Sequence, residues 1–215
     1  MKHFVITIED IEEALQTAKR CVQSGAKHGV LIKHFSAVTP RNTNIYSMLS
    51  DEGISQIGFE EKYSRIENCI AAFLSHYSLW KKCVEDKVNY TIFEHDAVVV
   101  DQLNSTIAFD KVVTLGKPSY GRYNTPTFLG TGPLVQKKYF GGAHAYRISP
   151  EGAKELIAQA KVHARPTDVF LHIDTFPWLQ ENYPWKVEVK ESFSTIQKTE
   201  GCLAKHGYGE GYGLL

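Results

Sequence analysis

One long amphipathic stripe constrains the fold of this chain more than any other feature. Apolar side chains recur at intervals of three and four residues, at Ile66, Ile70, Phe73, Tyr77, Trp80 and Val84. This spacing places them on one face of an α-helix, which we expect to run from about Glu60 to Asp86. Tyr90–Phe93, which follows, is rich in β-forming residues and predicts a buried strand.

The segments before this stripe alternate between strand and helix patterns. Phe4–Ile8 and Val30–Val38 predict two strands. Between them, Glu9–Gly25 predicts a helix that ends at Gly25, with its apolar face at Ile11, Leu15, Ala18 and Val22. The short connections indicate a parallel strand pair. We therefore expect an α/β fold with a mainly parallel sheet flanked by helices.

The second half of the chain is less regular. Lys111–Leu115 predicts a further strand, and residues 116–142, rich in Gly, Pro and Tyr, predict a long functional loop. Ser149 and Pro150 are typical of a helix start, with the apolar face supplied by Ala153, Leu156, Ile157 and Ala160. Residues 201–215 predict a flexible tail to a single domain.

Composition excludes several classes of protein. The 215 residues carry 24 Lys and Arg against 24 Asp and Glu, so the electrostatic signature of a nucleic-acid binder is missing and no nucleic-acid partner is expected. No apolar run approaches the length of a membrane span, and the N-terminus does not read as a signal peptide. Four scattered cysteines favour reduced thiols and a cytoplasmic location.

A charged triplet ends the strand predicted at Tyr90–Phe93. In YTIFEHDAVVV, Glu94 and Asp96 lie two residues apart, so in an extended segment both carboxylates point to the same side and His95 points away. Paired carboxylates suit Mg²⁺ or Mn²⁺ held partly by the phosphates of a substrate. In an α/β sheet, ligands bind beyond the carboxyl ends of the strands, which favours a binding cleft over a solvated turn.

Four sequence blocks carry a resemblance to a known family. The run AAFLSHYSLWKKCVEDKVNYTIFEHDAVV, the strand FDKVVTLG, the block AYRISPEGAKELI and Pro166-Thr167-Asp168 agree in order and spacing with glycosyltransferase family 25, the lipooligosaccharide and collagen galactosyltransferase group. The positions that match the two longer motifs are Leu74, Ser75, His76, Trp80, Val84, Glu94, Asp96, Tyr146, Ile148, Ser149, Gly152, Ala153 and Leu156.

The resemblance implies a GT-A-type, Rossmann-like fold and the transfer of a hexose, galactose or glucose, from a UDP-sugar to a carbohydrate acceptor, with inversion. It assigns residues 1–116 to the nucleotide-sugar half and 117–200 to the acceptor half. Glu94 and Asp96 would hold a divalent metal, Mn²⁺ or Mg²⁺, and the diphosphate, with His95, Ser75 and His76 as further donor-binding candidates. Inverting transfer needs a general base, for which Asp168 is the first candidate.

Several assignments have alternatives. Asp174 is the second candidate for the base, or with His172 a further metal ligand, while Asp168 also suits a helix N-cap. His95 stands where the family has Asp, and ITIEDIEEALQTAKR is acidic where the family carries arginines. These departures keep open a catalytically degenerate module that binds a nucleotide sugar or glycan, or a viral glycosyltransferase acting on a modified DNA base or protein.

Overall fold

A computed structural model describes residues 1–60, 65–103, 106–190, 193–196 and 213–214. The helices of this part of the chain are α1 (Glu12–Lys27), α2 (Ile45–Glu52), the 3-10 helix η1 (Ile57–Phe59), α3 (Ile66–Asp86), α4 (Pro150–Val162) and α5 (Thr167–Phe170). The strands of the main sheet are β1 (Lys2–Thr7), β2 (Lys33–Ser36), β3 (Tyr90–Phe93), β5 (Val112–Thr114), β6 (Gly130–Pro133), β7 (Ala145–Ile148) and β8 (Gln180–Tyr183). Two small pairs lie outside it: β4 (Ala97–Val99) with β9 (Val187–Val189), and β10 (Phe193–Ser194) with β11 (Gly213–Leu214).

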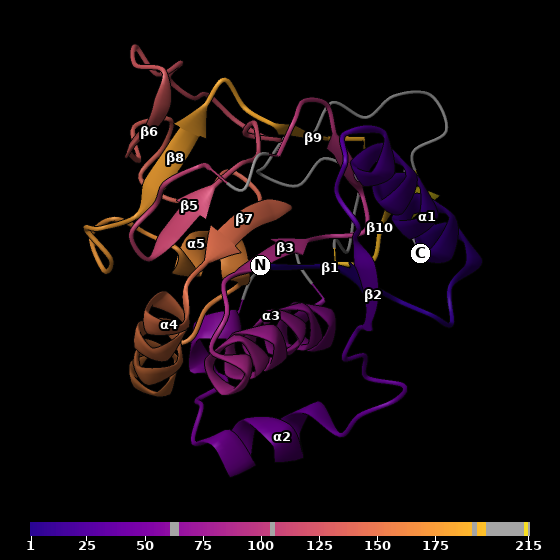
Figure 1. Cartoon of the computed structure of the whole chain (residues 1–215). Coiled ribbons are helices and arrows are strands. Elements are labelled where there is room, and N and C mark those ends of the chain that lie inside the picture. The colour runs from indigo at the N-terminus through magenta and orange to yellow at the C-terminus, as the bar shows by residue number, and fades with distance from the viewer. Residues whose placement is uncertain (61–64, 104–105, 191–192, 197–212, 215) are drawn as a thin grey trace.

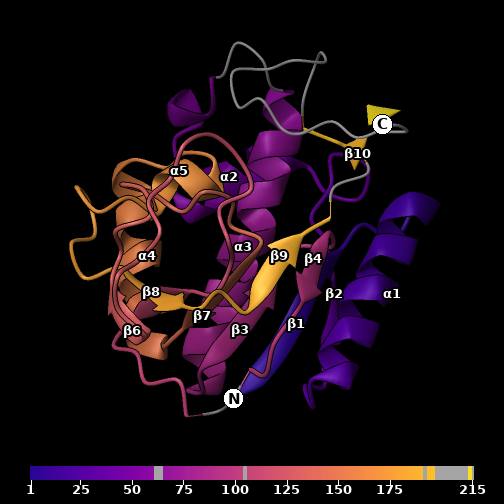
Figure 2. The ribbon, with the colours of Figure 1, turned by 90° about the horizontal axis from the view of Figure 1, so that it is seen from above.

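The main sheet has the strand order β2-β1-β3-β7-β5-β8-β6, which can be followed in Figure 1; Figure 2 shows the same ribbon from above. β1 pairs in parallel with both β2 and β3, and β5 pairs in parallel with β8. β7 runs antiparallel to both of its neighbours, and β6 runs antiparallel to β8. Because β7 reverses the direction twice, β2, β1, β3, β5 and β8 all point the same way. The expected α/β class with a mainly parallel sheet is confirmed, and the β-α-β opening is parallel as predicted.

The two faces of the sheet are covered differently. Figure 1 shows α2, α3 and α4 on one side of the sheet and α1 with β9 on the other. The larger core lies between the sheet and α3, where Phe73 meets the rings of Trp80 and Phe170 at centroid distances of 5.6 and 5.5 Å. A smaller core lies under α1, around Val5, Phe93 and other apolar side chains.

Helix α3 begins at Ile66, later than predicted. Residues 61–64, which the sequence prediction also placed in this helix, lie outside the described residues. The predicted stripe faces the core as expected: Trp80 is fully buried, and Val84 packs against the core at the edge of the stripe. The prediction of its C-terminal end at Asp86 is confirmed.

Helix α1 differs from the prediction in both its end and its buried face. It continues through Gly25 to Lys27, and a side chain at Gly25 would place Cβ 2.5 Å from Ile32 Cδ1, so the glycine serves packing rather than termination. The buried face is built from small residues, Ala14, Thr17, Ala18, Cys21 and Ser24. Small side chains let this helix approach the backbone of β4, where Ser24 Oγ accepts the Val99 N–H at 2.9 Å.

The second half also refines the predictions. The long loop predicted at 116–142 contains the short strand β6, which the sequence did not indicate. Ser149 caps α4 as expected, since its hydroxyl accepts the Gly152 N–H at 3.1 Å. The predicted tail lies outside the described residues except for β11. No helix in the described ranges is sufficiently long and apolar to span a bilayer.

Candidate functional site

A cavity of about 640 Å³ opens beyond the carboxyl ends of β1, β2 and β3. Chain segments that follow these three strands form part of its wall, including Asp10 after β1, Arg41 after β2 and the Glu94–Asp96 triplet after β3. The opposite wall comes from the second half of the chain, with Tyr120, Lys137, Tyr139 and Asp168 among its residues. The cavity therefore lies where open α/β sheets bind ligands, and residues from both the first and the second half of the chain form its walls.

The Glu-His-Asp triplet forms a turn, and the extended geometry predicted for it is wrong. The Ala97 N–H donates to the Glu94 carbonyl at 3.1 Å, because the chain must bend there to leave the main sheet and pair β4 with β9. Glu94, His95 and Asp96 nevertheless all line the cavity, His95 included, which was expected to point away. The triplet is therefore both a turn that ends the strand and a charged cluster on the wall of a cavity.

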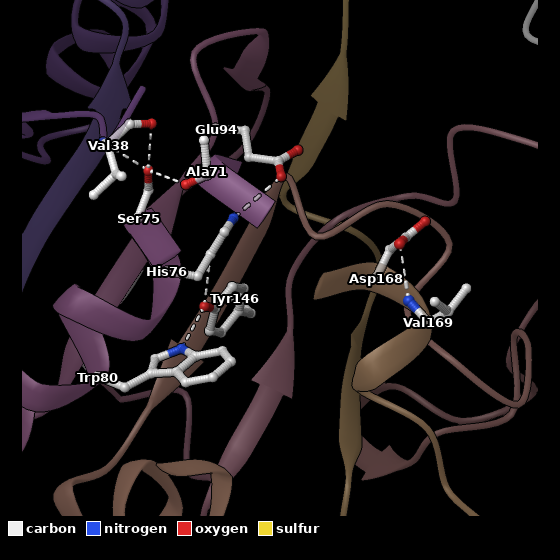
Figure 3. A network of polar contacts seen from close by, with 9 residues as sticks. All are labelled: Val38, Ala71, Ser75, His76, Trp80, Glu94, Tyr146, Asp168 and Val169. Carbon is white, nitrogen blue, oxygen red and sulfur yellow. Dashed lines mark hydrogen bonds and ion pairs between the residues drawn. The ribbon is translucent and has the colours of Figure 1, made fainter. Parts of the chain in front are cut away.

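A chain of buried hydrogen bonds leads to Glu94. The indole Nε1–H of Trp80 donates to the hydroxyl of Tyr146 at 2.8 Å, and that hydroxyl lies 2.9 Å from Nδ1 of His76. Nε2 of His76 lies 3.2 Å from Oε1 of Glu94. Figure 3 shows these four side chains in sequence, from the core to the cavity wall. His76 is 1% exposed, so the chain has no access to solvent until it reaches Glu94.

The direction of these bonds follows from their first donor. Indole nitrogen can only donate, so the Tyr146 oxygen accepts from Trp80 and its own hydrogen is directed to His76. Nδ1 of His76 is then the acceptor, and Nε2 carries the hydrogen that it donates to Glu94. Burial alone would raise the pKa of Glu94, but the hydrogen bond from His76 opposes burial, and this pKa is held below its usual value. The network therefore keeps Glu94 ionised and fixed in orientation.

Ser75 and His95, two further donor-binding candidates, occupy different settings. Ser75 is fully buried: its hydroxyl accepts the Val38 N–H at 2.9 Å and donates to Ala71 O at 2.9 Å, which ties α3 to the segment after β2 (Figure 3). His95 stacks on Phe193 with ring centroids 5.3 Å apart. Burial lowers the pKa of His95, against the opposing effect of Glu94, which favours a neutral imidazole on the cavity wall.

Asp168 lines the cavity from α5, on the wall opposite the triplet. Its carboxylate accepts hydrogen bonds from the Tyr120 hydroxyl and, at 2.9 Å, from the Val169 N–H. Burial raises the pKa of Asp168, and the negative charge of Glu94 adds to this rise, while the two hydrogen bonds oppose it. Pro166 occupies the N-cap position, so Asp168 is not the cap of α5.

Asp174 lies outside the cavity. Its side chain is 67% exposed, with its carboxylate 3.9 Å from Lys138 Nζ and 3.6 Å from His172 Nδ1. Neither Asp174 nor His172 lines the cavity wall. The structure thus separates the two base candidates that the sequence left open, and it brings only Asp168 to the same cavity as Glu94 and Asp96.

The candidate ligands for a metal ion are carboxylates that do not enclose a metal site. Within the described ranges, no three His, Cys, Asp or Glu side chains converge in an arrangement that could hold a metal ion. Glu94 and Asp96 are hard oxygen donors on one wall, and the hydrogen bond from His76 to Glu94 is made to Oε1. Such an open pair fits an ion that takes its remaining ligands from water and substrate phosphates.

Two features of this site escaped the sequence analysis. Tyr146 matched a motif, but nothing in its spacing indicated that its hydroxyl would link His76 to Trp80 across more than 60 residues. Tyr120, Lys137 and Tyr139 lie in the predicted long loop, and only the tyrosine-rich composition of that loop pointed to them.

Comparison with known proteins finds one family. The model of the family described as glycosyltransferase family 25 (LPS biosynthesis protein) matches residues 1–127. A "Glycosyltransferase 25 family member" of Drosophila pseudoobscura pseudoobscura is 26% identical over 200 residues, 85% of this chain and 30% of that protein. A protein of the same name in Drosophila melanogaster is 26% identical over 175 residues, 74% of this chain and 28% of the relative.

A third relative carries a different name. The rat "Probable inactive glycosyltransferase 25 family member 3" is 27% identical over 155 residues, 64% of this chain and 27% of that protein. The chain spans less than a third of the length of each of these relatives. One solved structure, A197 from STIV, aligns over 84% of this chain and 81% of its own at 12% identity and a TM-score of 0.41, too distant to support an inference.

The family model covers 127 of the 215 residues, which is more than half of the chain. The matched range includes α3, the acidic triplet, and three of the four residues of the hydrogen-bond chain, namely Trp80, His76 and Glu94. This chain belongs to glycosyltransferase family 25.

Proposed function

We propose that this chain is a metal-dependent, inverting glycosyltransferase that moves a hexose, galactose or glucose, from a UDP-sugar to a glycan-type acceptor. One observation carries the proposal: Glu94, Asp96 and Asp168 come from different halves of a family 25 chain and line one cavity beyond the carboxyl ends of parallel strands. In this proposal, residues 1–116 bind the nucleotide sugar and residues 117–200 bind the acceptor.

Glu94 and Asp96 would hold Mn²⁺ or Mg²⁺ at the end of the cavity formed by the first half of the chain. The ion would supply positive charge that neutralises the departing nucleoside diphosphate. The contribution of the chain itself is preorganisation: the His76 bond fixes the Glu94 carboxylate in its ionised form before any ligand arrives. His95, beside it on the wall, would contact the donor as a neutral imidazole.

Asp168 would act as the general base toward the acceptor hydroxyl. A carboxylate accepts a proton more readily when its pKa lies above the usual range, and burial together with the charge of Glu94 shifts Asp168 in that direction. The Tyr120 and Val169 bonds hold its two oxygens in place. The acceptor proton would pass to Asp168 as the hydroxyl oxygen attacks the anomeric carbon.

A thermal-shift panel tests this proposal. UDP-, GDP- and CMP-sugars are each added at about 100 times their dissociation constant, with Mn²⁺ and then with EDTA. Binding at this ratio adds about 2.7 kcal/mol to the free energy of unfolding, so Tm should rise by roughly 5 to 10 °C for a chain of this length. We expect a UDP-sugar to give this rise with Mn²⁺ and to lose it in EDTA. No response to any nucleotide sugar would contradict the proposal.

A second candidate is a degenerate module that binds a nucleotide sugar without turnover. Asp10, in the acidic first loop, forms a 2.9 Å ion pair with Arg41, and both residues line the cavity. The positive charge of Arg41 is therefore already neutralised by the protein rather than left for the phosphates of a nucleotide. The same panel followed by an assay for released UDP separates the two candidates. Metal-dependent stabilisation without UDP release, with or without added sugars, would favour the binding module.

A further inference from the structure

The wall around Asp168 contains a cluster that the proposed function leaves unused. Tyr120, Tyr139 and His172 form a stack, with ring centroids 6.2 Å apart for the first pair and 6.1 Å for the second. The ammonium of Lys137 lies over both tyrosine rings, 4.9 Å from the centroid of Tyr120 and 5.2 Å from that of Tyr139. Lys137 and both tyrosines line the cavity.

Two glycines leave room for the Lys137 side chain. A Cβ at Gly121 would lie 2.8 Å from Nζ of Lys137, and one at Gly141 would lie 3.1 Å from its Cδ. A larger residue at either position would displace the lysine from the rings. The ammonium therefore lies against two aromatic faces, in space that two glycines leave open.

The positive charge of Lys137 has no acidic partner within the described part of the chain. Two other cations differ in this respect: Lys138, next in sequence, lies 3.9 Å from Asp174, and Arg41, on the opposite wall, lies 2.9 Å from Asp10. Lys137 makes no ion pair with any described carboxylate, and contact with aromatic rings stabilises a cation without neutralising it. A half-buried ammonium on a cavity wall gains most from an anion that enters the cavity.

The position of the cluster indicates which ligand supplies that anion. Tyr120 connects the two groups, since its ring lies under Lys137 and its hydroxyl donates to Asp168. A sugar whose hydroxyl reaches Asp168 would extend its neighbouring substituents along the Tyr120 ring toward Lys137. The expected diphosphate position, at Glu94 and Asp96, comes from the other half of the chain.

We infer that Lys137, Tyr120 and Tyr139 form an acceptor subsite that selects acceptors bearing a carboxylate or phosphate group. This inference rests on the proposed function, because it takes Asp168 as the group that meets the acceptor. The tyrosine rings provide an apolar surface for the sugar, and the ammonium provides the specificity. Neutral sugars would bind the same surface more weakly.

The test compares three probes, methyl glucoside, methyl glucuronide and glucose 6-phosphate, by NMR titration with and without UDP and Mn²⁺. The variant Lys137→Met keeps the apolar stem over the rings and removes the charge. Lys138→Met is the matched control, because its side chain is 71% exposed and lies outside the cavity wall. We expect the wild type and Lys138→Met to bind at least one anionic probe about fivefold more tightly than methyl glucoside, the effect of one partly exposed ion pair.

In Lys137→Met this preference should disappear while the affinity for methyl glucoside stays the same. A wild type that binds no probe, or binds the neutral sugar as tightly as both anionic ones, contradicts the inference. A Lys137→Met variant with weakened UDP binding and an unchanged preference among the probes also contradicts it, and would assign the lysine to the diphosphate. Failure of UDP to bind the wild type while the anionic preference persists would count against the proposed function and not against the subsite.

Discussion

The two walls of the cavity are built in different ways. The wall with Glu94 rests on α3, β3 and β7, and a buried hydrogen-bond chain from Trp80 determines the orientation and ionisation of its carboxylate. The wall with Asp168 rests on a four-residue helix and the loop that carries Tyr120, whose hydroxyl is one of its partners. The core therefore orients the carboxylate of Glu94, whereas the position of Asp168 depends on a contact with a loop residue. Four substitutions test this difference.

The largest effect on activity is expected from Asp168→Asn. Loss of the general base should lower kcat about 10²- to 10⁴-fold.

Burial raises the folded-state pKa of this carboxyl, so ionised Asp168 reduces stability at neutral pH. The free energy of unfolding of the variant should therefore equal or exceed that of the wild type at pH 7. Any gain in the free energy of unfolding over the wild type should become smaller toward pH 4, where the Asp168 carboxyl of the wild type is also protonated. Urea unfolding at both pH values measures this, and a clear loss of stability at pH 7 would mean that Asp168 is structural.

The largest effect on stability is expected from Tyr146→Phe. It leaves Trp80 Nε1 and His76 Nδ1 buried without the hydroxyl, which should lower the free energy of unfolding by about 1–3 kcal/mol. Tyr77→Phe is a matched control that removes one bond to Glu52, and it should cost about 1 kcal/mol or less. Nitrogen NMR of His76 should report the Nε2–H tautomer in the wild type and also in Tyr146→Phe, because the Glu94 carboxylate still accepts from Nε2. The Nδ1–H tautomer in the wild type would contradict the bond directions assigned from Trp80 to Glu94.

Tyr120→Phe should change pH dependence rather than stability. The Tyr120 bond lowers the pKa of Asp168 against the effect of burial, so its removal should raise that pKa further. Because the base acts as the carboxylate, the acid limb of the kcat/KM profile should move to higher pH. A pH–rate profile of variant and wild type measures the shift. Movement of the acid limb to lower pH would contradict the role given to Asp168.

The smallest effect is expected from Asp174→Asn. This carboxylate is exposed, lies outside the cavity and makes only long contacts. Activity and UDP affinity should change by less than about twofold, as for most surface substitutions. Steady-state kinetics beside Asp168→Asn provide the comparison, and a loss of similar size in both variants would return Asp174 to the reaction.

Local periodicity accounts for the parts of the fold that were predicted correctly. The stripe from Ile70 to Trp80 and the strand before Glu94 depend on neighbouring residues, and both elements form as expected. The turn at Glu94–Asp96 depends on β4 leaving the sheet to pair with β9, about 90 residues later, which no local pattern contains. The buried face of α1 was missed because packing against β4 selects small residues rather than the most apolar ones.

The candidate site shows the same division between features that the local sequence indicates and features that depend on distant contacts. The acidic triplet was recognised because a charged cluster at a strand end is unusual, and Asp168 because of its motif. The role of Tyr146 and the contact between Tyr120 and Asp168 join residues 48 or more positions apart, so only the folded chain reveals them. Lys137 was missed because a single lysine in a polar loop is ordinary until its aromatic neighbours and missing counter-charge are known.

The central claim is that Glu94 and Asp96 form a metal-dependent nucleotide site. Calorimetric titration of UDP into the wild type and Asp96→Asn, with Mn²⁺ and with EDTA, tests it most directly. The wild type should bind UDP at least about tenfold more tightly with Mn²⁺ than with EDTA, and Asp96→Asn should bind weakly in both, while its free energy of unfolding stays within about 1 kcal/mol of the wild type. Equal UDP affinity with and without Mn²⁺, or an unaffected Asp96→Asn, would contradict the account.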